Sequence, residues 1–595
     1  MSRSAAFTAA AWLALAAVPA VRASDDGSQL RSPFRIDYLG YLQAGPKVAL
    51  FLAPQGGSLA WTVEDASGAA VARGTTSDYV ANDFASGDSF FRIDFSTFHG
   101  TGKGLRLAAN GQRSEPFDVD GRNPYGRLAE EGFHYFEVHR TEDTVFEKFL
   151  DNWTSGRIEG PFWKDAGDNG SYPTNTAIAV WTLLNLYERY PEANTGLGPV
   201  SIYDEVKVGT VLMHQLILPG QKLAIAKLHT NVPPYGPCPP HSSGPCVSMT
   251  ETKATYAMAR SLAQLARAHL REKQPAEAKR AFALARAAYT NARTEPPVCR
   301  GFESFGGEGG IYPDNDPWAL WRETGKHREP CHPGRDNIED DSFAALVEVF
   351  LAAQALGDPQ ASALARDVVA HPRFAEISEF WWYATAATGN LSLLTLRPAG
   401  IDLAPIRRNL FRYADELVGY EKVGYPGVTK DVHSQRWNTG DRDELDQNWR
   451  WGSNRNLLDD AILLAFAAEE KAGDHQPTQA AAYAAAAVRV LDYILGTNAM
   501  ALCMVTGFGE NAVERLHDCC VPNSVPGQMA LGPNNWTNAG DPDMPPFGSL
   551  PGMKMMPVKG RGWGARELAI DGNAPLVWVA WWAQHRAADL LGPAK

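Results

Sequence analysis

The periodicity of apolar residues changes near Tyr125, and this change limits the folds that the chain can adopt. Between about residues 31 and 120, apolar and polar residues alternate in short runs such as Lys47–Leu52 and Leu59–Glu64, separated by turn-forming clusters. Such alternation is typical of strands with one buried face. From Tyr125 onward, apolar residues recur with helical spacing. The sequence therefore predicts a multidomain protein in which a β-sandwich precedes an all-helical domain.

The two regions differ in size. Residues 30–121 match one immunoglobulin-like module, which we expect to brace the chain without chemistry of its own. In the second region, residues 125–592, we expect helices over 126–140, 174–190, 201–217, 252–271, 275–293, 340–357, 359–370, 374–388, 403–419, 454–472, 477–495 and 573–591. Long segments rich in Gly, Pro and Trp separate some of them, at 218–250, 296–338, 420–453 and 498–566. Because loops of that length usually carry function, we expect a barrel of helical hairpins with a groove at one end.

Composition and charge exclude some partners. The chain has 595 residues, 45% of them hydrophobic and 21% charged, as in an ordinary globular protein of more than one domain. Its net charge is -13 and the sequence contains no basic stripe, which argues against nucleic acid as a partner. An acidic surface tolerates a cationic substrate. The sequence leaves the oligomeric state open.

The first 23 residues have the pattern of a secretory signal peptide. A basic start precedes an apolar run from Ala5 to Val18, and Ala23 ends a stretch of small residues suited to cleavage. This run is too short to cross a bilayer, and no later segment has about 18 consecutive apolar residues. We therefore expect no membrane span, cleavage near Ala23, and export to the periplasm or the medium, which such a signal does not distinguish.

Seven cysteines in an exported chain can form disulfides with one thiol left over. The spacing suggests that Cys238 pairs with Cys246, Cys299 with Cys331, and Cys503 with Cys519 or Cys520. A zinc site is the alternative for the first group, with His229, Cys238, His241 and Cys246 as ligands. Disulfides are favoured, because that spacing matches no standard zinc pattern. Structural calcium could bind acid-rich loops at 314–316, 339–341 and 541–543, although a solvated surface is the commoner role of such loops.

Residues 160–172 hold the strongest candidate for chemistry. Asp165 and Asp168 lie among three glycines, so that the backbone can turn sharply around them. Trp163 and Tyr172 flank these acids and carry flat apolar faces of the kind that stack on sugar rings. Cleavage of a glycosidic bond needs one carboxylate to activate a water and a distant acid to protonate the leaving oxygen. Taken alone, two aspartates before a helix are more often a helix cap or a calcium loop.

Further motifs follow in a fixed order along the chain. They are Ile36–Leu42, Ser114–Phe117, Trp163–Asp168, Gly309–Asn315, Asp340–Phe343, Trp451–Asn454, Leu491–Asn498, Val505–Gly509, Leu516–Asp518 and Glu567–Val577. Together they resemble glycoside hydrolase family 9, in the members that carry an immunoglobulin-like module before an (α/α)6 barrel. The resemblance covers nearly the whole mature chain.

The resemblance implies an inverting glycosidase that needs no cofactor for its chemistry. Asp168 would be the general base, Asp165 would hold the same water, and Glu567 would be the general acid. Two acids in one loop cannot easily flank a glycosidic bond and leave room for a water, so the acid must come from elsewhere in the chain. Partial burial would raise the pKa of Glu567 and keep it protonated. Taken alone, a glutamate before a helix more often faces the helix dipole.

The resemblance also implies that Trp163, Tyr172, Trp451 and His517 bind the substrate, an oligo- or polysaccharide. Where many relatives have an arginine after a similar motif, this chain has Cys519 and Cys520, and Arg566 precedes the acid in place of a small polar residue. These departures favour soluble glucans or short oligosaccharides over crystalline cellulose.

We therefore expect a secreted glycoside hydrolase that cleaves β-1,4-glucosidic bonds in cellulose-like polysaccharides, soluble β-glucans or cellodextrins, by internal or terminal attack. An exo-β-glucosaminidase acting on chitosan oligosaccharides is the alternative enzyme. A non-catalytic glycan-binding protein is the alternative of another class, and the presence of all three candidate acids argues against it.

Overall fold

The protein is described by a computed structural model. The described residues are 32–120, 124–141, 157–228, 250–298, 338–430, 449–519, 521, 523–535, 541–546, 549–558 and 560–592, with the backbone of 145–146, 229 and 246–247. The expected signal peptide, residues 1–23, lies outside them. So do Cys238, Cys299 and Cys331 and the side chain of Cys246, and with them the first two expected disulfides.

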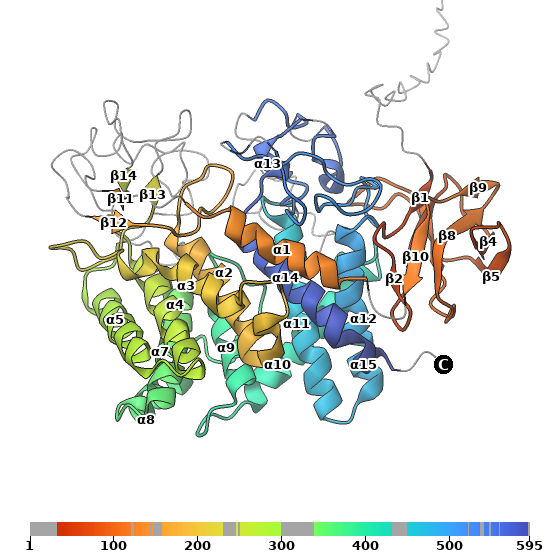
Figure 1. Cartoon of the computed structure of the whole chain (residues 1–595). Helices are drawn as coiled ribbons and strands as arrows, with labels where there is room; N and C mark the ends of the chain where they lie inside the picture. Colours follow the sequence, from red (N-terminus) through yellow and green to blue (C-terminus); the bar gives the residue numbers. More distant parts are fainter. Residues whose placement is uncertain are drawn as a thin grey trace, which may run out of the picture. The chain divides into compact units, whose positions relative to one another are not determined.

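The N-terminal module consists of two packed sheets (Figure 1). The first sheet contains β1 (Phe34–Arg35), β3 (Val48–Leu52), β7 (Phe90–Asp94) and β6 (Tyr79–Val80), in that order. The second contains β2 (Tyr41–Leu42), β10 (Phe117–Asp120), β8 (Gly102–Ala109), β4 (Leu59–Glu64) and β5 (Ala70–Thr76), with β9 (Gln112–Arg113) paired to β8. Along β4, Leu59, Trp61 and Val63 are buried while the residues between them are more exposed, as period two requires. The expected sandwich is confirmed.

The described helices of the second region form two sets. One set is buried along most of its length: α2 (Pro173–Arg189), α4 (Thr252–Arg271), α7 (Ile338–Leu356), α9 (Ala386–Leu396), α11 (Ser453–Gly473) and α14 (Ile570–His585). The other set has more exposed residues: α1 (Gly126–Val138), α3 (Ile202–Thr210), α5 (Pro275–Thr294), α8 (Ala361–Ala370), α10 (Ala404–Glu421) and α12 (Pro477–Ile494). Packing of α14 on α2, α2 on α4, α4 on α7 and α7 on α9 makes the first set an inner layer.

Short elements connect these helices. They are α13 (Trp563–Arg566), α15 (Ala587–Leu591), the pair β11 (Val145–Phe146) and β12 (Ile158–Glu159), and the pair β13 (Leu228–His229) and β14 (Cys246–Val247). Among the described residues, 3-10 turns cover Pro191–Thr195, Leu212–His214 and Gly552–Lys554. Prolines at first helical positions begin α2, α5 and α12, where a missing N–H costs nothing.

The expected helix over 374–388 is wrong. Residues 374–385 form a loop, and α9 begins only at Ala386. The Asn390 side chain stabilises this loop, because its amide donates to the carbonyl of Glu376 (2.8 Å) and its oxygen accepts the amide of Ala375 (3.0 Å). A buried side chain thus satisfies backbone groups that a helix would have paired, and apolar periodicity does not reveal it.

Contacts join the sandwich to the helical region. Arg92 on β7 donates two hydrogen bonds to the carbonyl of Gly424, at 3.2 and 2.6 Å. Asp88 accepts from the Tyr425 hydroxyl (2.7 Å) and from the Lys554 ammonium (2.6 Å). Each of these pairs links residues more than 300 positions apart in the chain.

A pair of buried carboxyls lies at the same junction. Asp37 follows β1 and accepts the amides of Leu39 (2.6 Å) and Gly40 (3.0 Å), and it shares a hydrogen bond with Asp492 of α12. Burial and the neighbouring Asp492 raise the pKa of Asp37. Burial likewise raises the pKa of Asp492 to about 7. The two carboxyls therefore hold a proton at mildly acidic pH.

Candidate active site

The loop before α2 turns tightly around its two aspartates. The amide of Asp165 donates to the carbonyl of Gly170 (2.7 Å), and that of Asn169 donates to Ala166 (2.9 Å). Asn169 adopts a φ of 58°, in the left-handed region that asparagine tolerates better than most residues. Two neighbouring backbone segments hold this loop, because Ala166 forms a bridge with Ala569 and the amide of Cys519 donates to Gly167 (2.7 Å).

Asp168 is an ionised carboxylate held by two side chains. Its Oδ2 accepts hydrogen bonds from the Tyr172 hydroxyl (2.5 Å) and the Lys227 ammonium (2.8 Å), and its Oδ1 accepts the Gly170 amide (3.1 Å). Burial alone would raise its pKa, but the charge and hydrogen bond of Lys227, together with the hydrogen bonds from Tyr172 and Gly170, outweigh burial and lower the pKa below the usual value. A side-chain exposure of 9% leaves this carboxylate accessible to a small molecule.

Asp165 lies deeper, with no exposed surface. Its Oδ2 accepts from the Asn175 amide (3.0 Å), whereas its Oδ1 has no partner among the described residues. Burial raises its pKa well above the usual value, and the nearby charges of Asp571 and Asp168 add to that rise. Asp165 is therefore a neutral carboxyl at mildly acidic pH.

Glu567 reaches the same loop from the other end of the chain. It follows α13, is 6% exposed, and accepts hydrogen bonds from the Trp451 indole (2.9 Å) and the Gly167 amide. Burial and the charge of Asp168 raise its pKa well above the usual value, although both hydrogen bonds oppose this. The Gly167 contact joins the expected base loop to the expected acid, so the structure brings together all three acids that the sequence predicted.

Ion pairs among the described residues divide the carboxyls of this site into two kinds. Four carboxyls interact here, on Asp165, Asp168, Glu567 and Asp571. Two cations balance them: Lys227 pairs with Asp168, and the fully buried Arg455 pairs with Asp571 at 2.6 Å. The two carboxyls without an ion pair are the two with raised pKa values, Asp165 and Glu567.

Sequence analysis missed Lys227, Arg455 and Asp571. Lys227 reaches Asp168 because Leu228, the next residue, forms an antiparallel bridge with Ser171. No spacing pattern links residues 59 positions apart through one short bridge. For Asp571 a signal existed, because it precedes the apolar run Ala574–Ala583, and charges in such surroundings are rarely buried unless they are paired. Arg455 stands among polar residues, between Ser453 and Asn456, and carried no such signal.

The expected role of Trp163 is corrected. We expected this ring to face a sugar, but it is 1% exposed and packs on Phe136 of α1 with ring centroids 4.8 Å apart. Its indole N–H donates to Glu205 of α3 (2.7 Å), and a Cβ on Gly209 would lie 2.5 Å from the ring. Trp163 is therefore part of the core that holds the base loop in place.

The other expected sugar contacts lie at the acids. Tyr172 is fully buried and donates to Asp168, and Trp451 is 5% exposed and donates to Glu567. Contact of these rings with a substrate stays a prediction. His517 is half-buried between the two acid segments, because its amide donates to the carbonyl of Arg566 (2.8 Å) and its ring lies against Gly167. The Arg566 guanidinium donates to loop carbonyls such as that of Pro557 (2.9 Å), so it holds a loop.

The third expected disulfide is wrong for Cys503. Cys503 is a free, fully buried thiol whose Sγ contacts the Val505 carbonyl at 3.5 Å. Cys519 is disulfide-bonded and lies beside Gly167, where its Sγ also accepts from Asn169 (3.0 Å). Cysteine spacing could not separate these environments, because a buried thiol behaves as a small apolar side chain.

The described residues contain no cluster of three or more His, Cys, Asp or Glu side chains suited to a metal ion. In the expected zinc set, the backbones of His229 and Cys246 are paired, while Cys238, His241 and all four side chains lie outside the described residues. Of the expected calcium loops, 314–316 also lies outside the described residues. In the loop 339–341, Asp341 pairs with Lys253 at 3.3 Å, and in the loop 541–543, Asp541 accepts hydrogen bonds from two backbone amides.

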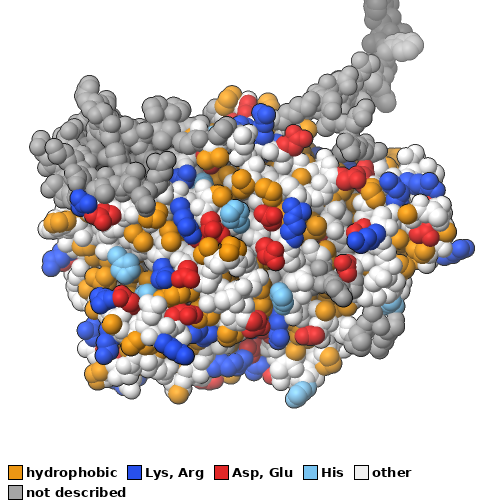
Figure 2. Space-filling view, in the orientation of Figure 1, with side chains coloured by type: hydrophobic (Ala, Val, Ile, Leu, Met, Phe, Trp, Pro, Cys, Tyr) orange, Lys and Arg blue, Asp and Glu red, His pale blue; other side chains and the backbone are white. Residues whose placement is uncertain are grey.

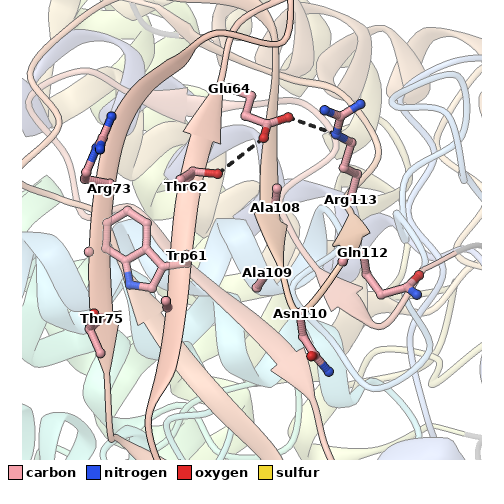
Figure 3. A pocket seen from close by; sticks show the side chains of 13 residues that line it. Trp61, Thr62, Glu64, Arg73, Thr75, Ala108, Ala109, Asn110, Gln112 and Arg113 are labelled. Atoms are coloured by element: carbon pink, nitrogen blue, oxygen red, sulfur yellow. Dashed lines mark hydrogen bonds and ion pairs between the residues drawn. The ribbon is translucent and has the colours of Figure 1, made fainter.

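A hollow of about 810 Å³ lies on the sandwich (Figure 3). Glu64 and Arg113 meet across it at 2.8 Å, and the Trp61 ring covers Gly74, where a Cβ would lie 2.3 Å from the ring. The residues that line it form an open sheet face, and we assign it no chemistry.

On the visible face of the molecule, acidic and basic side chains are interspersed (Figure 2).

Comparison with known proteins places the chain in a family. The model of "Glycosyl hydrolase family 9" matches residues 160–580, and that of "Cellulase N-terminal ig-like domain" matches residues 29–114. Endoglucanase C of Cellulomonas fimi is 26% identical over 619 residues, which cover 93% of this chain and 52% of that protein. A cellulose 1,4-beta-cellobiosidase of Acetivibrio thermocellus is 24% identical over an alignment that covers 94% of this chain and 68% of that protein. The chain thus spans about half the length of the first of these relatives and two thirds of the second.

Solved structures share the fold. A metagenome-derived family 9 endoglucanase superposes with a TM-score of 0.72 at 24% identity, covering 93% of this chain and 99% of that one. A family 9 protein of Bacteroides ovatus gives a TM-score of 0.71 at 19% identity, with coverage of 93% and 99%. The inner and outer helices described above are thereby confirmed as an (α/α)6 barrel. The chain belongs to glycosyl hydrolase family 9.

Proposed function

We propose that the protein is an exported, inverting glycoside hydrolase that cleaves β-1,4-glucosidic bonds in soluble β-glucans or cellodextrins. One observation carries this proposal: Asp168 and Glu567 meet at one loop, and their surroundings move their pKa values in opposite directions. A pair of carboxyls divided in this way supplies a base and an acid at the same pH.

In the proposed reaction a water lies between Asp168 and the anomeric carbon of the sugar. Asp168 accepts a proton from this water as the water oxygen forms a bond to the anomeric carbon. Glu567 donates its proton to the glycosidic oxygen as the bond between that oxygen and the anomeric carbon breaks. The attack comes from the face opposite the leaving group, so the configuration inverts. The neutral Asp165, whose Oδ1 has no partner among the described residues, would hold the same water.

The names of the relatives support the proposed substrate class. The curated relatives carry the names endoglucanase, cellulose 1,4-beta-cellobiosidase and cellodextrinase, the last from Butyrivibrio fibrisolvens at 30% identity over 33% of this chain. All three names refer to glucose polymers or oligomers. The described site has more carboxyls than cations, which would also suit the positively charged amino groups of a glucosamine oligomer. The test below therefore includes such an oligomer.

Export is proposed on two grounds. The first 23 residues match a signal peptide, and the disulfide at Cys519 fits an oxidising compartment. Among the described residues, no helix is long and apolar enough to cross a membrane.

The test is a product time course with purified protein on cello-oligosaccharides and chitosan oligomers, with the anomer of each fresh product assigned by NMR. Inverted glucose products support the proposal, and early product sizes separate internal from terminal attack. Release of glucosamine alone would replace the substrate, and retained configuration would contradict the proposed mechanism. Binding without turnover, equal in wild type and Asp168→Asn, would favour a glycan-binding protein.

A further inference from the structure

Lys227 holds the carboxylate that the proposed mechanism uses as its base. Its ammonium lies 2.8 Å from Asp168 Oδ2 and also donates to the Tyr172 hydroxyl, which in turn donates to the same oxygen (2.5 Å). The Lys227 side chain is 2% exposed and lies 4.2 Å from the centroid of the Tyr172 ring. A buried ammonium is costly unless it is paired with a carboxylate, so this cation and Asp168 depend on each other.

The two aspartates of the loop differ in what faces them. Within the part of the chain that the structure describes, the Asp165 side chain accepts a hydrogen bond only from the neutral Asn175 amide, whereas Asp168 is paired with a cation. The second buried cation, Arg455, is engaged by Asp571. Among the described residues, the titratable groups that interact with Asp168 are Lys227, Tyr172, Asp165, Glu567, His139 and His517. The two histidines have lowered pKa values, mainly because of burial, so that Lys227 supplies the positive charge.

Geometry adds a second effect to that of charge. Lys227 and Tyr172 both bind Oδ2, while among the described residues Oδ1 receives only the Gly170 amide. A carboxylate oxygen can accept two hydrogen bonds, so Oδ1 keeps an acceptor position for the reacting water. The contacts on Oδ2 also fix the rotation of the carboxylate plane.

We propose that Lys227 is a positioning residue that makes Asp168, rather than Asp165, the general base, by holding the Asp168 carboxylate ionised with Oδ1 directed to the reacting water. This inference rests on the proposed function. It concerns a residue 59 positions from Asp168 and outside the segment that carries the catalytic motif.

The test compares Lys227→Met, Lys227→Arg and the matched control Lys222→Met, an exposed lysine five positions earlier. For each variant, kcat/KM on a cello-oligosaccharide is measured from acidic to alkaline pH. Loss of the Lys227 charge raises the pKa of Asp168, so Lys227→Met moves the acidic limb of the profile to higher pH. For Lys227→Met we expect the loss of kcat/KM relative to the wild type to be on the order of tenfold larger at pH 5 than at pH 7. The reason is that, below the pKa of Asp168, its ionised fraction changes tenfold for each unit of pKa.

Lys227→Arg keeps the charge and should keep the acidic limb near that of the wild type, and Lys222→Met should match the wild type throughout. The inference would be overturned if Lys227→Met lost kcat/KM by the same factor at every pH, or if its pH profile of kcat/KM matched that of the wild type. If Lys227→Met does not fold, as judged by its melting curve, Tyr172→Phe replaces it. That change removes one hydrogen bond from Oδ2, should move the acidic limb in the same direction, and overturns the inference if the limb stays in place.

Asp168→Asn in the same assay separates this inference from the proposed function. If Asp168→Asn retains most turnover, the base assignment fails and the inference fails with it. If Asp168→Asn is inactive while Lys227→Met keeps the wild-type profile, the proposed function stands and only the role of Lys227 is overturned.

Discussion

Asp168 and Glu567 carry the same carboxyl group, and their neighbours move the two pKa values in opposite directions. Lys227 lowers the pKa of Asp168, while burial raises that of Glu567. In the proposed mechanism the base Asp168 works above its pKa and the acid Glu567 works below its own, so the dependence of activity on pH should be bell-shaped. We expect kcat/KM to fall at low pH as Asp168 is protonated and at high pH as Glu567 ionises, which a pH series on a cello-oligosaccharide measures.

Removal of the acid should stop the reaction without harm to the fold. Glu567→Gln keeps the shape of the side chain but has no proton to donate, so we expect turnover to fall roughly 10²–10⁴-fold. The control is Glu130→Gln on α1, where the side chain is exposed. Turnover of Glu567→Gln within a few-fold of the wild type would contradict the assignment.

Trp451 should influence the pKa of Glu567, the proposed acid. Its indole N–H stabilises the charged form of Glu567 and so lowers the pKa of that carboxyl. Trp451→Phe keeps an aromatic ring and removes the donor, so the pKa of Glu567 should rise. We expect the alkaline limb of the kcat/KM profile to move to higher pH while the acidic limb stays in place. A shift of the acidic limb instead would point to Asp168.

At the scale of elements, the junction of β1 and α12 should make stability depend on pH. Folding raises the pKa of Asp492 to about 7, from an unfolded value of about 4. A raised pKa contributes stability that is complete below the unfolded value and is lost as pH rises to about 7. Asp492→Asn removes this dependence on pH. The difference between the unfolding midpoint of the variant and that of the wild type should therefore increase from pH 4 to pH 7 and stay constant above pH 7.

The control is Asp367→Asn, an exposed residue of α8. Its difference from the wild type should not vary with pH. A constant difference for Asp492→Asn as well would show that the Asp37–Asp492 pair is ionised already at low pH. Denaturant titrations at several pH values measure both variants.

Helix and strand periodicity predicted most elements, because most of them bury one continuous face. The bounds expected for β4 and α4 agree with the structure. Periodicity failed where single buried side chains decide the backbone, as Asn390 does before α9. In the site, motifs identified Asp165, Asp168 and Glu567, whose residue types are fixed by the chemistry. Lys227 was not predictable, because its role depends on a bridge between Leu228 and Ser171 that no spacing encodes.

At the scale of the whole molecule, the sandwich should stabilise the barrel partly through hydrogen bonds from charged side chains. Arg92 donates from a charged group to the backbone around Gly424. Hydrogen bonds from charged groups typically contribute about 1.5–3 kcal/mol. Arg92→Ala should therefore lower the midpoint of thermal unfolding while kcat and KM stay near those of the wild type. Arg73→Ala, on the exposed face of β5, is the control and should leave the midpoint unchanged.

The buried carboxyls of the active site have a further consequence for heat resistance. Burial raises the pKa values of Asp165 and Glu567 above those of the same groups in an unfolded chain, so their burial favours unfolding at neutral pH. Amide replacements at either position should raise the melting temperature at pH 7, and this gain should shrink in acid. Selection of this enzyme for thermal endurance alone would then enrich inactive variants, because the groups that make the site reactive are also among those that weaken the fold.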